Sequence, residues 1–192
     1  MNLSVLMSIY HKEKPEYFHK TMESIWTNQT LRPDEIILVE DGILSDHLYS
    51  AVNYWKEKIG TKLVSVPLPK NMGLALALNE GLKVAKGNFI ARMDTDDIAV
   101  PDRFEKQVQL MEKDKLDLLG GHIAEFIDNP DEIVSYRRVP TQHADIVAYQ
   151  RMRSAFNHMT VMFKKDMVLK AGNYEDGLYM EDDLLWLNMI AS

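Results

Sequence analysis

Three carboxylates lie within four positions of one another, directly after a short apolar run. Asp94, Asp96 and Asp97 follow the segment FIARM (residues 89–93), which predicts a buried strand. Two unit charges about 4 Å apart repel by roughly 4 kcal/mol at an effective dielectric constant of about 20, so folded chains rarely gather such charges without a cation. Magnesium-type ions are typically held by one or two carboxylates, together with water and substrate phosphate oxygens. The spacing therefore predicts a metal-diphosphate site; the simpler alternative is a solvated acidic turn before a helix.

The same acids do not match a calcium-binding EF-hand loop. Twelve residues counted from Asp94 end at Glu105, as such a loop requires, but its sixth position is Ala99 instead of glycine. Its fifth position is Ile98, which is no ligand, and Pro101 at the eighth position is typical of the first turn of a helix. The pattern therefore favours an open site at a strand end over a closed calcium site.

The segments around this cluster alternate between strand-like and helix-like patterns. Apolar runs predict strands at 4–9, 35–39, 63–66, 89–93 and 159–163, with less regular strands at 117–126 and 133–139. Apolar residues at helical spacing predict helices at 17–28, 48–59, 73–85, 104–111 and 184–190. This alternation predicts an α/β fold, with a mostly parallel sheet covered by helices on both faces.

Polar residues follow several of the predicted strands. In open sheets of this kind, ligands bind outside the carboxyl ends of the strands, where loops converge. Residues 8–11 follow the first strand, Asp41 follows the second, and the acids at 94–97 follow the fourth. One acid can accept a hydrogen bond from an N–H of a base such as uracil, and another can bind a ribose hydroxyl. A cation held by the acids can bind a diphosphate. We therefore expect one crevice that fits a nucleoside diphosphate.

Length and composition limit the other possibilities. The chain has 192 residues, 46% of them hydrophobic, which predicts a single domain over residues 1–192. Its formal net charge is −7, so the chain lacks the excess of basic residues that is expected of a general nucleic-acid-binding protein. It contains no cysteine, its apolar start at 3–9 is too short for a secretory signal, and no run predicts a transmembrane span. We therefore expect a cytoplasmic protein.

The last predicted helix carries apolar residues around most of its circumference. They are Leu184, Leu185, Trp186, Leu187, Met189 and Ile190. Because such a helix needs a partner, we expect either a longer protein that supplies further C-terminal elements or packing in an oligomer. Residues beyond this chain could also contact the inner face of the cell membrane.

Five segments resemble glycosyltransferase family 2, whose members are nucleotide-sugar-dependent enzymes with the GT-A fold, a Rossmann-like, mixed and mostly parallel sheet. The resemblance covers nearly the whole chain. The segments, in order, are SVLMSIYH, EIILVEDG, NMGLALALNEGLKVAKGNFIARMDTDDIAVPDRFEKQ, FNHMTVMFKK and MEDDLLWL. Any one alone is weak evidence, but five in the right order make accidental similarity improbable.

The first two segments imply the nucleoside site. By resemblance, Ile9 and Tyr10 border the nucleoside, and Asp41 contacts the base with Glu40 beside it. Tyr10 has an alternative role as an aromatic lid on the edge of the core. The first segment departs from the family pattern at His11, where asparagine is usual, and the second has Glu40-Asp41-Gly42-Ile43 where two aspartates, glycine and serine are usual.

The third segment implies the metal-diphosphate motif. Asp94, Thr95 and Asp96 match the family's DXD motif, with both aspartates binding Mn²⁺ or Mg²⁺ and with Asp94 and Thr95 also at the nucleotide. Asp97 lies next to it as a donor or acceptor contact. Arg92, just before these acids, pairs either with them or with phosphate, and the ion pair is the simpler expectation.

The last two segments imply the catalytic end of the site. Asp182 matches the general base, although its neighbour Asp183 remains an alternative. Glu181 and Asp183 are further donor or acceptor contacts. His158 lies where the family commonly has a histidine near the acceptor, and a structural hydrogen bond explains it equally well.

The resemblance implies an inverting glycosyltransferase that uses a nucleotide sugar, most simply a UDP-sugar, in bacterial surface polysaccharide biosynthesis. Its acceptor would be a glycan or a lipid-linked glycan. A sugar-nucleotide nucleotidyltransferase would need a glycine-rich, basic loop after the first strand, where this chain has Ser8-Ile9-Tyr10-His11. A dehydrogenase would need a G-x-G-x-x-G segment, which is absent. A non-catalytic nucleotide- or glycan-binding relative remains a further alternative.

Overall fold

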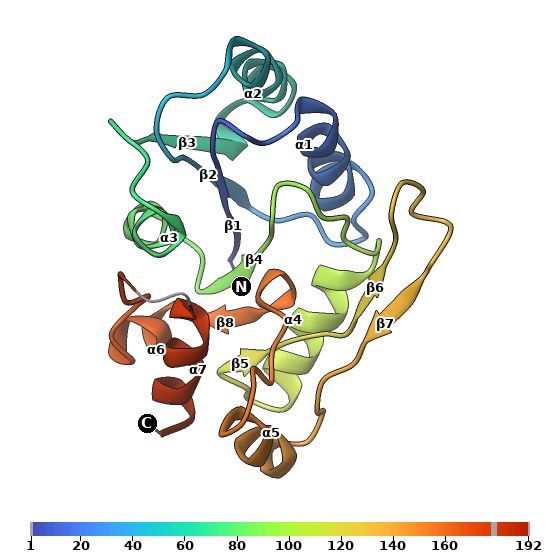
Figure 1. Cartoon of the computed structure of the whole chain (residues 1–192), viewed down its shortest axis with the longest axis vertical. Coiled ribbons are helices and arrows are strands. Elements are labelled where there is room, and N and C mark those ends of the chain that lie inside the picture. The colour runs from blue at the N-terminus through green and yellow to red at the C-terminus, as the bar shows by residue number, and fades with distance from the viewer. Residues whose placement is uncertain (1, 178–179, 192) are drawn as a thin grey trace.

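The computed structural model describes residues 2–177 and 180–191 and contains a six-stranded sheet with helices on both faces (Figure 1). The order of strands is β3-β2-β1-β4-β8-β5. The first four are parallel, and β8 runs antiparallel to both of its neighbours. The predicted α/β fold with a mixed, mostly parallel sheet is therefore confirmed. The strands are β1 (Leu3–Ile9), β2 (Glu35–Glu40), β3 (Leu63–Pro67), β4 (Phe89–Arg92), β5 (Leu118–Leu119) and β8 (Met162–Lys164).

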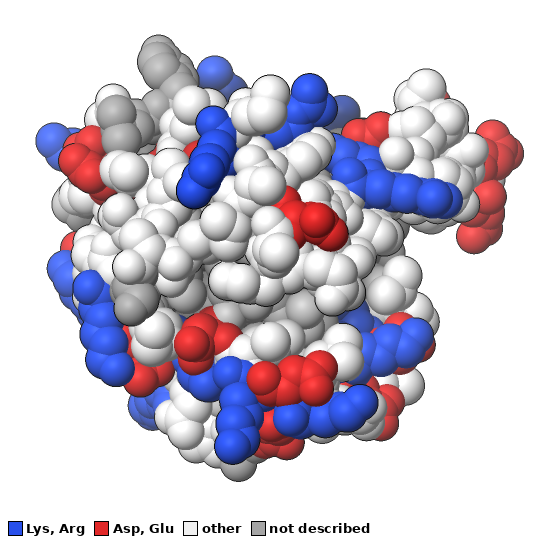
Figure 2. Space-filling view, turned by 90° about the horizontal axis from the view of Figure 1, so that it is seen from below, with Lys and Arg blue, Asp and Glu red and all other residues white. Residues whose placement is uncertain are grey.

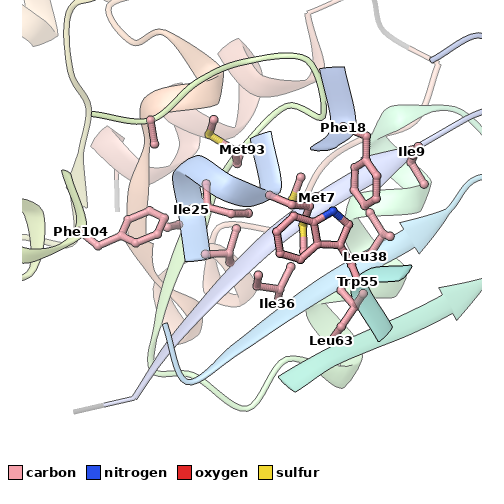
Figure 3. Packing of buried hydrophobic residues seen from close by; sticks show 14 of the residues in the cluster. Met7, Ile9, Phe18, Ile25, Ile36, Leu38, Trp55, Leu63, Met93 and Phe104 are labelled. Carbon is pink, nitrogen blue, oxygen red and sulfur yellow. The ribbon is translucent and has the colours of Figure 1, made fainter. Parts of the chain in front are cut away.

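Each central strand alternates its side chains between two hydrophobic cores. On β1, Met7 and Ile9 face the core beneath α1 (Pro15–Met22), α2 (Asp46–Ile59) and α4 (Arg103–Lys113), which Trp55 and Phe104 help to fill (Figure 3). Leu6 faces the opposite core, which is covered by α3, α6 and α7. The remaining helices are α3 (Leu74–Val84), α5 (His143–Gln150), α6 (Lys165–Lys170) and α7 (Glu181–Ala191). Because both faces are covered, β1, β2 and β4 consist almost entirely of buried residues.

Helix α3 packs close to the sheet because its residue 81 has no side chain. A Cβ atom on Gly81 would lie 2.9 Å from Cγ2 of Val39 on β2 and would also clash with Leu6 on β1. This close packing fixes the N-terminal end of α3 beside the carboxyl ends of β1 and β2.

The second half of the chain differs most from the predicted elements. The strand predicted at 159–163 is partly wrong, because residues 158–160 form a 3₁₀ turn in which Thr160 N donates to Asn157 O (2.8 Å). Only residues 162–164 pair with β4 and β5. The irregular strands at 117–126 and 133–139 shorten to β5 and the hairpin of β6 (Ile123–Glu125) and β7 (Ser135–Arg137). Helices α5 and α6 were not predicted, and the helix predicted at 17–28 ends in a π-helical turn, Glu23–Thr27.

The hairpin β6–β7 projects from the body of the molecule (Figures 1 and 2). On the face in Figure 2, acidic and basic side chains are interspersed, so this face has no broad basic surface of the kind that nucleic-acid binding uses. Within residues 2–177 and 180–191, no helix is both long and apolar enough to cross a membrane.

Candidate active site

A cleft of about 320 Å³ opens at the carboxyl ends of β1, β2 and β4. These strands are parallel neighbours, so the residues that follow them meet at one edge of the sheet. The volume lies in the range of about 300–1,000 Å³ that is typical of small-molecule sites. The cleft is lined by Ser8, Tyr10, Glu13, Asp41, Asn71, Gly73, Leu74, Asp94, Thr95 and Asp96. The structure thus brings together five of the predicted site residues.

Asp41 connects the end of β2 to the loop that leads into α3. Its Oδ1 accepts a hydrogen bond from the backbone N–H of Met72 (2.6 Å), and its Oδ2 accepts one from that of Gly73 (3.1 Å). Gly73 has a φ of +89°, a conformation that favours glycine. The buried Asp41 carboxylate therefore orders one wall of the cleft while it also lines it.

Two predicted nucleoside contacts lie outside the lining of this cleft. Glu40 is buried and accepts hydrogen bonds from the Ser65 hydroxyl and from Lys56 Nζ (3.3 Å), so its carboxylate is held between β3 and α2. The Ile9 side chain is fully buried in the core, so any contact of Ile9 with a ligand would come from its backbone. Both residues remain beside the cleft through their positions in β1 and β2.

Burial and then neighbouring acids raise the pKa of three carboxyl groups at or beside the cleft: Glu13, Asp96 and Asp97. Burial and then the charge of Asp94 raise the pKa of Asp96, and burial followed by Asp94 and Asp96 raises the pKa of Asp97 to about 6. Glu13, in the loop after β1, has its pKa raised by burial and then by Asp96 and Asp94. The sequence interpretation missed Glu13, although it follows β1 on the edge where ligands were expected. Burial is the largest cause of all three shifts, and the neighbouring acids add to it.

This set of oxygen donors fits a divalent cation that arrives with a diphosphate. Carboxylates suit Mg²⁺ and Mn²⁺, which usually take one or two of them and fill the other positions with water and phosphate. Over the ranges 2–177 and 180–191, no group of three or more His, Asp or Glu side chains is placed to hold a metal ion by itself. Asp94 and Asp96, which both line the cleft, would hold the cation in an open site.

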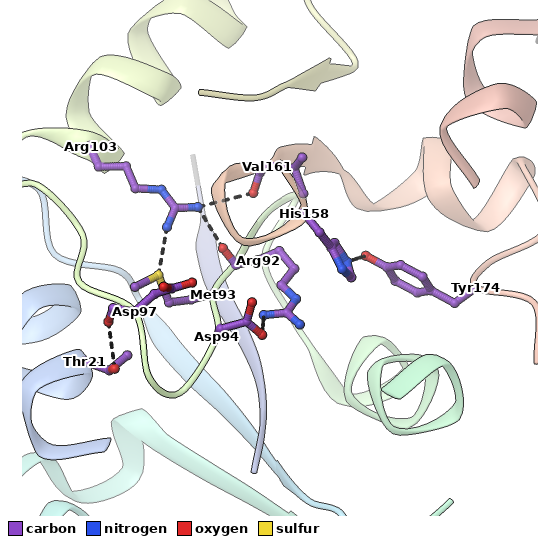
Figure 4. A network of polar contacts seen from close by, with 9 residues as sticks. All are labelled: Thr21, Arg92, Met93, Asp94, Asp97, Arg103, His158, Val161 and Tyr174. Atoms are coloured by element: carbon purple, nitrogen blue, oxygen red, sulfur yellow. Dashed lines mark hydrogen bonds and ion pairs between the residues drawn. The ribbon is translucent and has the colours of Figure 1, made fainter. Parts of the chain in front are cut away.

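Arg92, the last residue of β4, lies beneath the acids (Figure 4). Its side chain is 1% exposed, and its Nη1 forms an ion pair with Asp94 Oδ1, as the sequence led us to expect. Its backbone oxygen accepts a hydrogen bond from Nη2 of the half-buried Arg103 (2.7 Å). Burial and then Arg92 lower the pKa of Arg103 to about 10, which still leaves Arg103 charged at neutral pH. Two cationic side chains therefore support the loop that carries Asp94.

His158 lies on the other side of Arg92 and contacts Tyr174. Nε2 of His158 is 3.0 Å from the Tyr174 hydroxyl, which is the structural hydrogen bond that the sequence left open (Figure 4). Burial and then Arg92 hold the pKa of His158 well below its usual range, so the imidazole is neutral. His158 does not line the cleft.

Three acids occupy the first turn of α7: Glu181, Asp182 and Asp183. Burial, followed by the charges of Asp183 and Glu181, raises the pKa of Asp182. Asp182 and Asp94 both contribute to the raised pKa of Tyr174, so both act on the same phenol. The α7 acids do not line the cleft.

The family comparison matches residues 4–170 to a family described as glycosyl transferase family 2. The amylovoran biosynthesis glycosyltransferase AmsE of Erwinia amylovora is 46% identical over 189 residues, which cover 98% of this chain and 69% of AmsE. The UDP-Gal:alpha-D-GlcNAc-diphosphoundecaprenol beta-1,3-galactosyltransferase of Escherichia coli is 36% identical over 190 residues, which cover 98% of this chain and 68% of that enzyme.

Among solved structures, the mannosyltransferase PcManGT from Pyrobaculum calidifontis, in complex with GDP-Man and Mn²⁺, superimposes with a TM-score of 0.71. The match covers 98% of this chain and 51% of that one, at 17% identity, and a likeness at this identity concerns the fold alone. The chain thus spans a little over two thirds of the length of the two relatives and about half of PcManGT.

Proposed function

The chain belongs to glycosyltransferase family 2 and has the GT-A fold, and we propose that it transfers a sugar from a nucleoside diphosphate donor to a glycan acceptor, with inversion at the anomeric carbon. The observation that carries this proposal is the meeting of Asp41, Asp94 and Asp96 in one cleft. These three acids come from the ends of β2 and β4, and each suits a different part of a nucleotide sugar.

The donor would lie along the cleft. Asp41 accepts from the base, Tyr10 stacks beside it, and Thr95 contacts the nucleotide between the two metal-binding acids. Asp94 and Asp96 hold Mn²⁺ or Mg²⁺, which when bound neutralises charge on the departing diphosphate. The raised pKa values of Asp96 and Asp97 support this assignment, because they arise from burial and then from neighbouring acids, and a bound cation would stabilise the charged carboxylates.

Asp182 would act as the general base. The acceptor hydroxyl must lose a proton as it attacks the anomeric carbon, and a carboxylate with a raised pKa accepts that proton more readily. Attack from the face opposite the leaving group inverts the configuration, as it does in inverting glycosidases. Asp183 accepts a hydrogen bond from Gln150, which favours Asp182 over Asp183 for this role.

Substrate classes follow from the relatives by analogy. The E. coli enzyme is named for UDP-Gal and a diphosphoundecaprenol-linked acceptor, and AmsE for amylovoran biosynthesis. We therefore propose a UDP-sugar donor and a lipid-linked glycan acceptor in bacterial surface polysaccharide biosynthesis, at the cytoplasmic face of the membrane.

A panel of UDP-, GDP- and TDP-sugars with Mn²⁺ tests the proposal by thermal shift and by release of the nucleoside diphosphate. A ligand that binds only the folded state raises the melting temperature, and one donor class should do so in a metal-dependent manner. Asp96→Asn should lose this response, whereas Asp114→Asn, which removes an exposed acid at the end of α4, should retain it. Metal-dependent binding without any transfer or hydrolysis would favour the non-catalytic alternative, and no binding by any donor would contradict the proposal.

A further inference from the structure

The buried guanidinium of Arg92 depends on a residue that also faces the cleft. Its side chain is 1% exposed, whereas that of Asp94 is 33% exposed and lines the cleft. Nε of Arg92 is buried and makes no hydrogen bond, and the contact of the buried Nη1 is the ion pair with Asp94. The charge of Arg92 is therefore balanced chiefly through its ion pair with Asp94.

The neighbouring side chains His158, Arg103 and Tyr174 offer no replacement for Asp94. Asp96 and Asp97 interact with Arg92 through their charges but form no ion pair with it. His158 is neutral, and its pKa is lowered by burial and then by Arg92 itself. Arg103 is a second cation, and Tyr174 keeps its proton because burial raises its pKa. In the part of the chain that the structure describes, Asp94 is the only acid that forms an ion pair with Arg92. An event that draws Asp94 away would leave a buried cation unbalanced, which is strongly unfavourable.

We propose that Arg92 makes binding of the divalent cation conditional on the diphosphate. A metal ion held by Asp94 alone would lie next to a second positive charge and would compete with it for one carboxylate. A diphosphate beside Asp94 adds negative charge within range of both cations and so balances both. The metal and the nucleotide should therefore bind with positive coupling, and Arg92 should add to the part of it that direct coordination of phosphate by the metal provides. This inference rests on the proposed function, since it requires a nucleotide in this cleft.

Calorimetry of Mn²⁺ binding, without and with saturating UDP, tests the inference. UDP should tighten Mn²⁺ binding to the wild-type chain by about tenfold or more, within the roughly 5- to 150-fold range of typical couplings. Arg92→Met should bind Mn²⁺ alone more tightly than the wild type and should show weaker coupling than the wild type. Lys106→Met removes the same charge from an exposed side chain of α4 and should behave as the wild type. Arg92→Lys keeps the charge and should keep the coupling.

Four results would overturn the inference. Weaker binding of Mn²⁺ alone by Arg92→Met would mean that Arg92 orients Asp94 for the metal. Equal coupling in the wild type and Arg92→Met would give Arg92 no part in it. If Arg92→Met does not fold, loss of coupling in Arg92→Lys would still show that the charge is not the cause. UDP binding by the wild type without metal coupling would contradict this inference alone, whereas a complete lack of nucleotide binding would contradict the proposed function.

Discussion

Gln150 at the end of α5 donates a hydrogen bond from Nε2 to Asp183 Oδ1 of α7 (3.1 Å). Oε1 of the same buried amide accepts from Ala155 N (2.7 Å), so the side chain connects α5, the segment after it and the first turn of α7. The carboxylate of Asp183 is thus held by a structural partner. In contrast, within residues 2–177 and 180–191, no side chain forms a hydrogen bond or an ion pair with Asp182.

The two adjacent acids should therefore differ in their effect on turnover. Positioned base catalysis typically contributes roughly 10² to 10⁴-fold, so Asp182→Asn should lower kcat by about that factor while the Kd for UDP stays unchanged. Asp183→Asn still accepts from Gln150 and should lower kcat far less. Steady-state kinetics and UDP calorimetry on both variants measure this difference. Equal losses, or a larger loss in Asp183→Asn, would remove Asp182 from the role.

In a profile of kcat against pH, the fall on the acidic side should lie at a higher pH than the ordinary pKa of an aspartate. A general base works only when deprotonated, so kcat should fall as the pH decreases through the raised pKa of Asp182. Asp183 is the first charged neighbour that raises this pKa, after burial. Asp183→Asn should therefore move the acid limb to lower pH, as pH profiles of kcat can show. An unmoved limb would mean that another group titrates.

The elements that carry the cleft could be predicted from the sequence because their local pattern and their tertiary environment agree. Strands β1, β2 and β4 are apolar on both faces, and the sheet buries both faces. The position of β8 could not be predicted in the same way. Residues 162–164 enter the sheet beside β4 from a distant part of the chain, and nothing local to them specifies that antiparallel pairing.

The residues of the candidate site could likewise be predicted only in part. The strand-end rule located Asp41 and the acids at 94–96, because parallel neighbours bring their carboxyl ends together. Glu13 and Asn71 lie on loops whose paths depend on long-range contacts, such as that of Asn71 Nδ2 with Asp41 O (3.3 Å). The partner of His158 lies 16 residues away in a loop, so sequence alone left that hydrogen bond as one of two alternatives.

Loss of the Asp41 carboxylate should weaken both the fold and nucleotide binding. Asp41→Ala leaves the N–H groups of Met72 and Gly73 without their acceptor, which should lower the free energy of unfolding by about 1–3 kcal/mol. UDP affinity should fall as well. Asp34→Ala is the matched control, because Asp34 Oδ2 accepts from Leu3 N (2.8 Å) at the opposite end of the strands. It should affect stability without changing UDP affinity, and undiminished UDP binding by Asp41→Ala would contradict the assignment.

Asp97 should destabilise the empty protein at neutral pH. Its pKa is about 6 in the folded state against an ordinary value of 3.8, so the folded state binds the proton more tightly than the unfolded state. Its contribution to the free energy of unfolding therefore falls as the pH rises from about 3.8 to 6 and stays low above that range. Asp97→Asn should be more stable than the wild type at pH 7, on the order of 1 kcal/mol, and this difference should vanish near pH 4. Urea unfolding of both proteins at the two pH values measures it; a less stable variant at pH 7 would refute the prediction.

The central claim is that acids at the end of β4 bind a nucleoside diphosphate through a divalent cation. Isothermal titration of UDP, GDP and TDP into the protein, with Mn²⁺ and after chelation, tests it most directly, together with Asp96→Asn. We expect one nucleotide to bind well only with Mn²⁺, and Asp96→Asn to bind it as weakly as the chelated wild type does. Equal affinity for all three nucleotides after chelation, unchanged by Asp96→Asn, would contradict the claim.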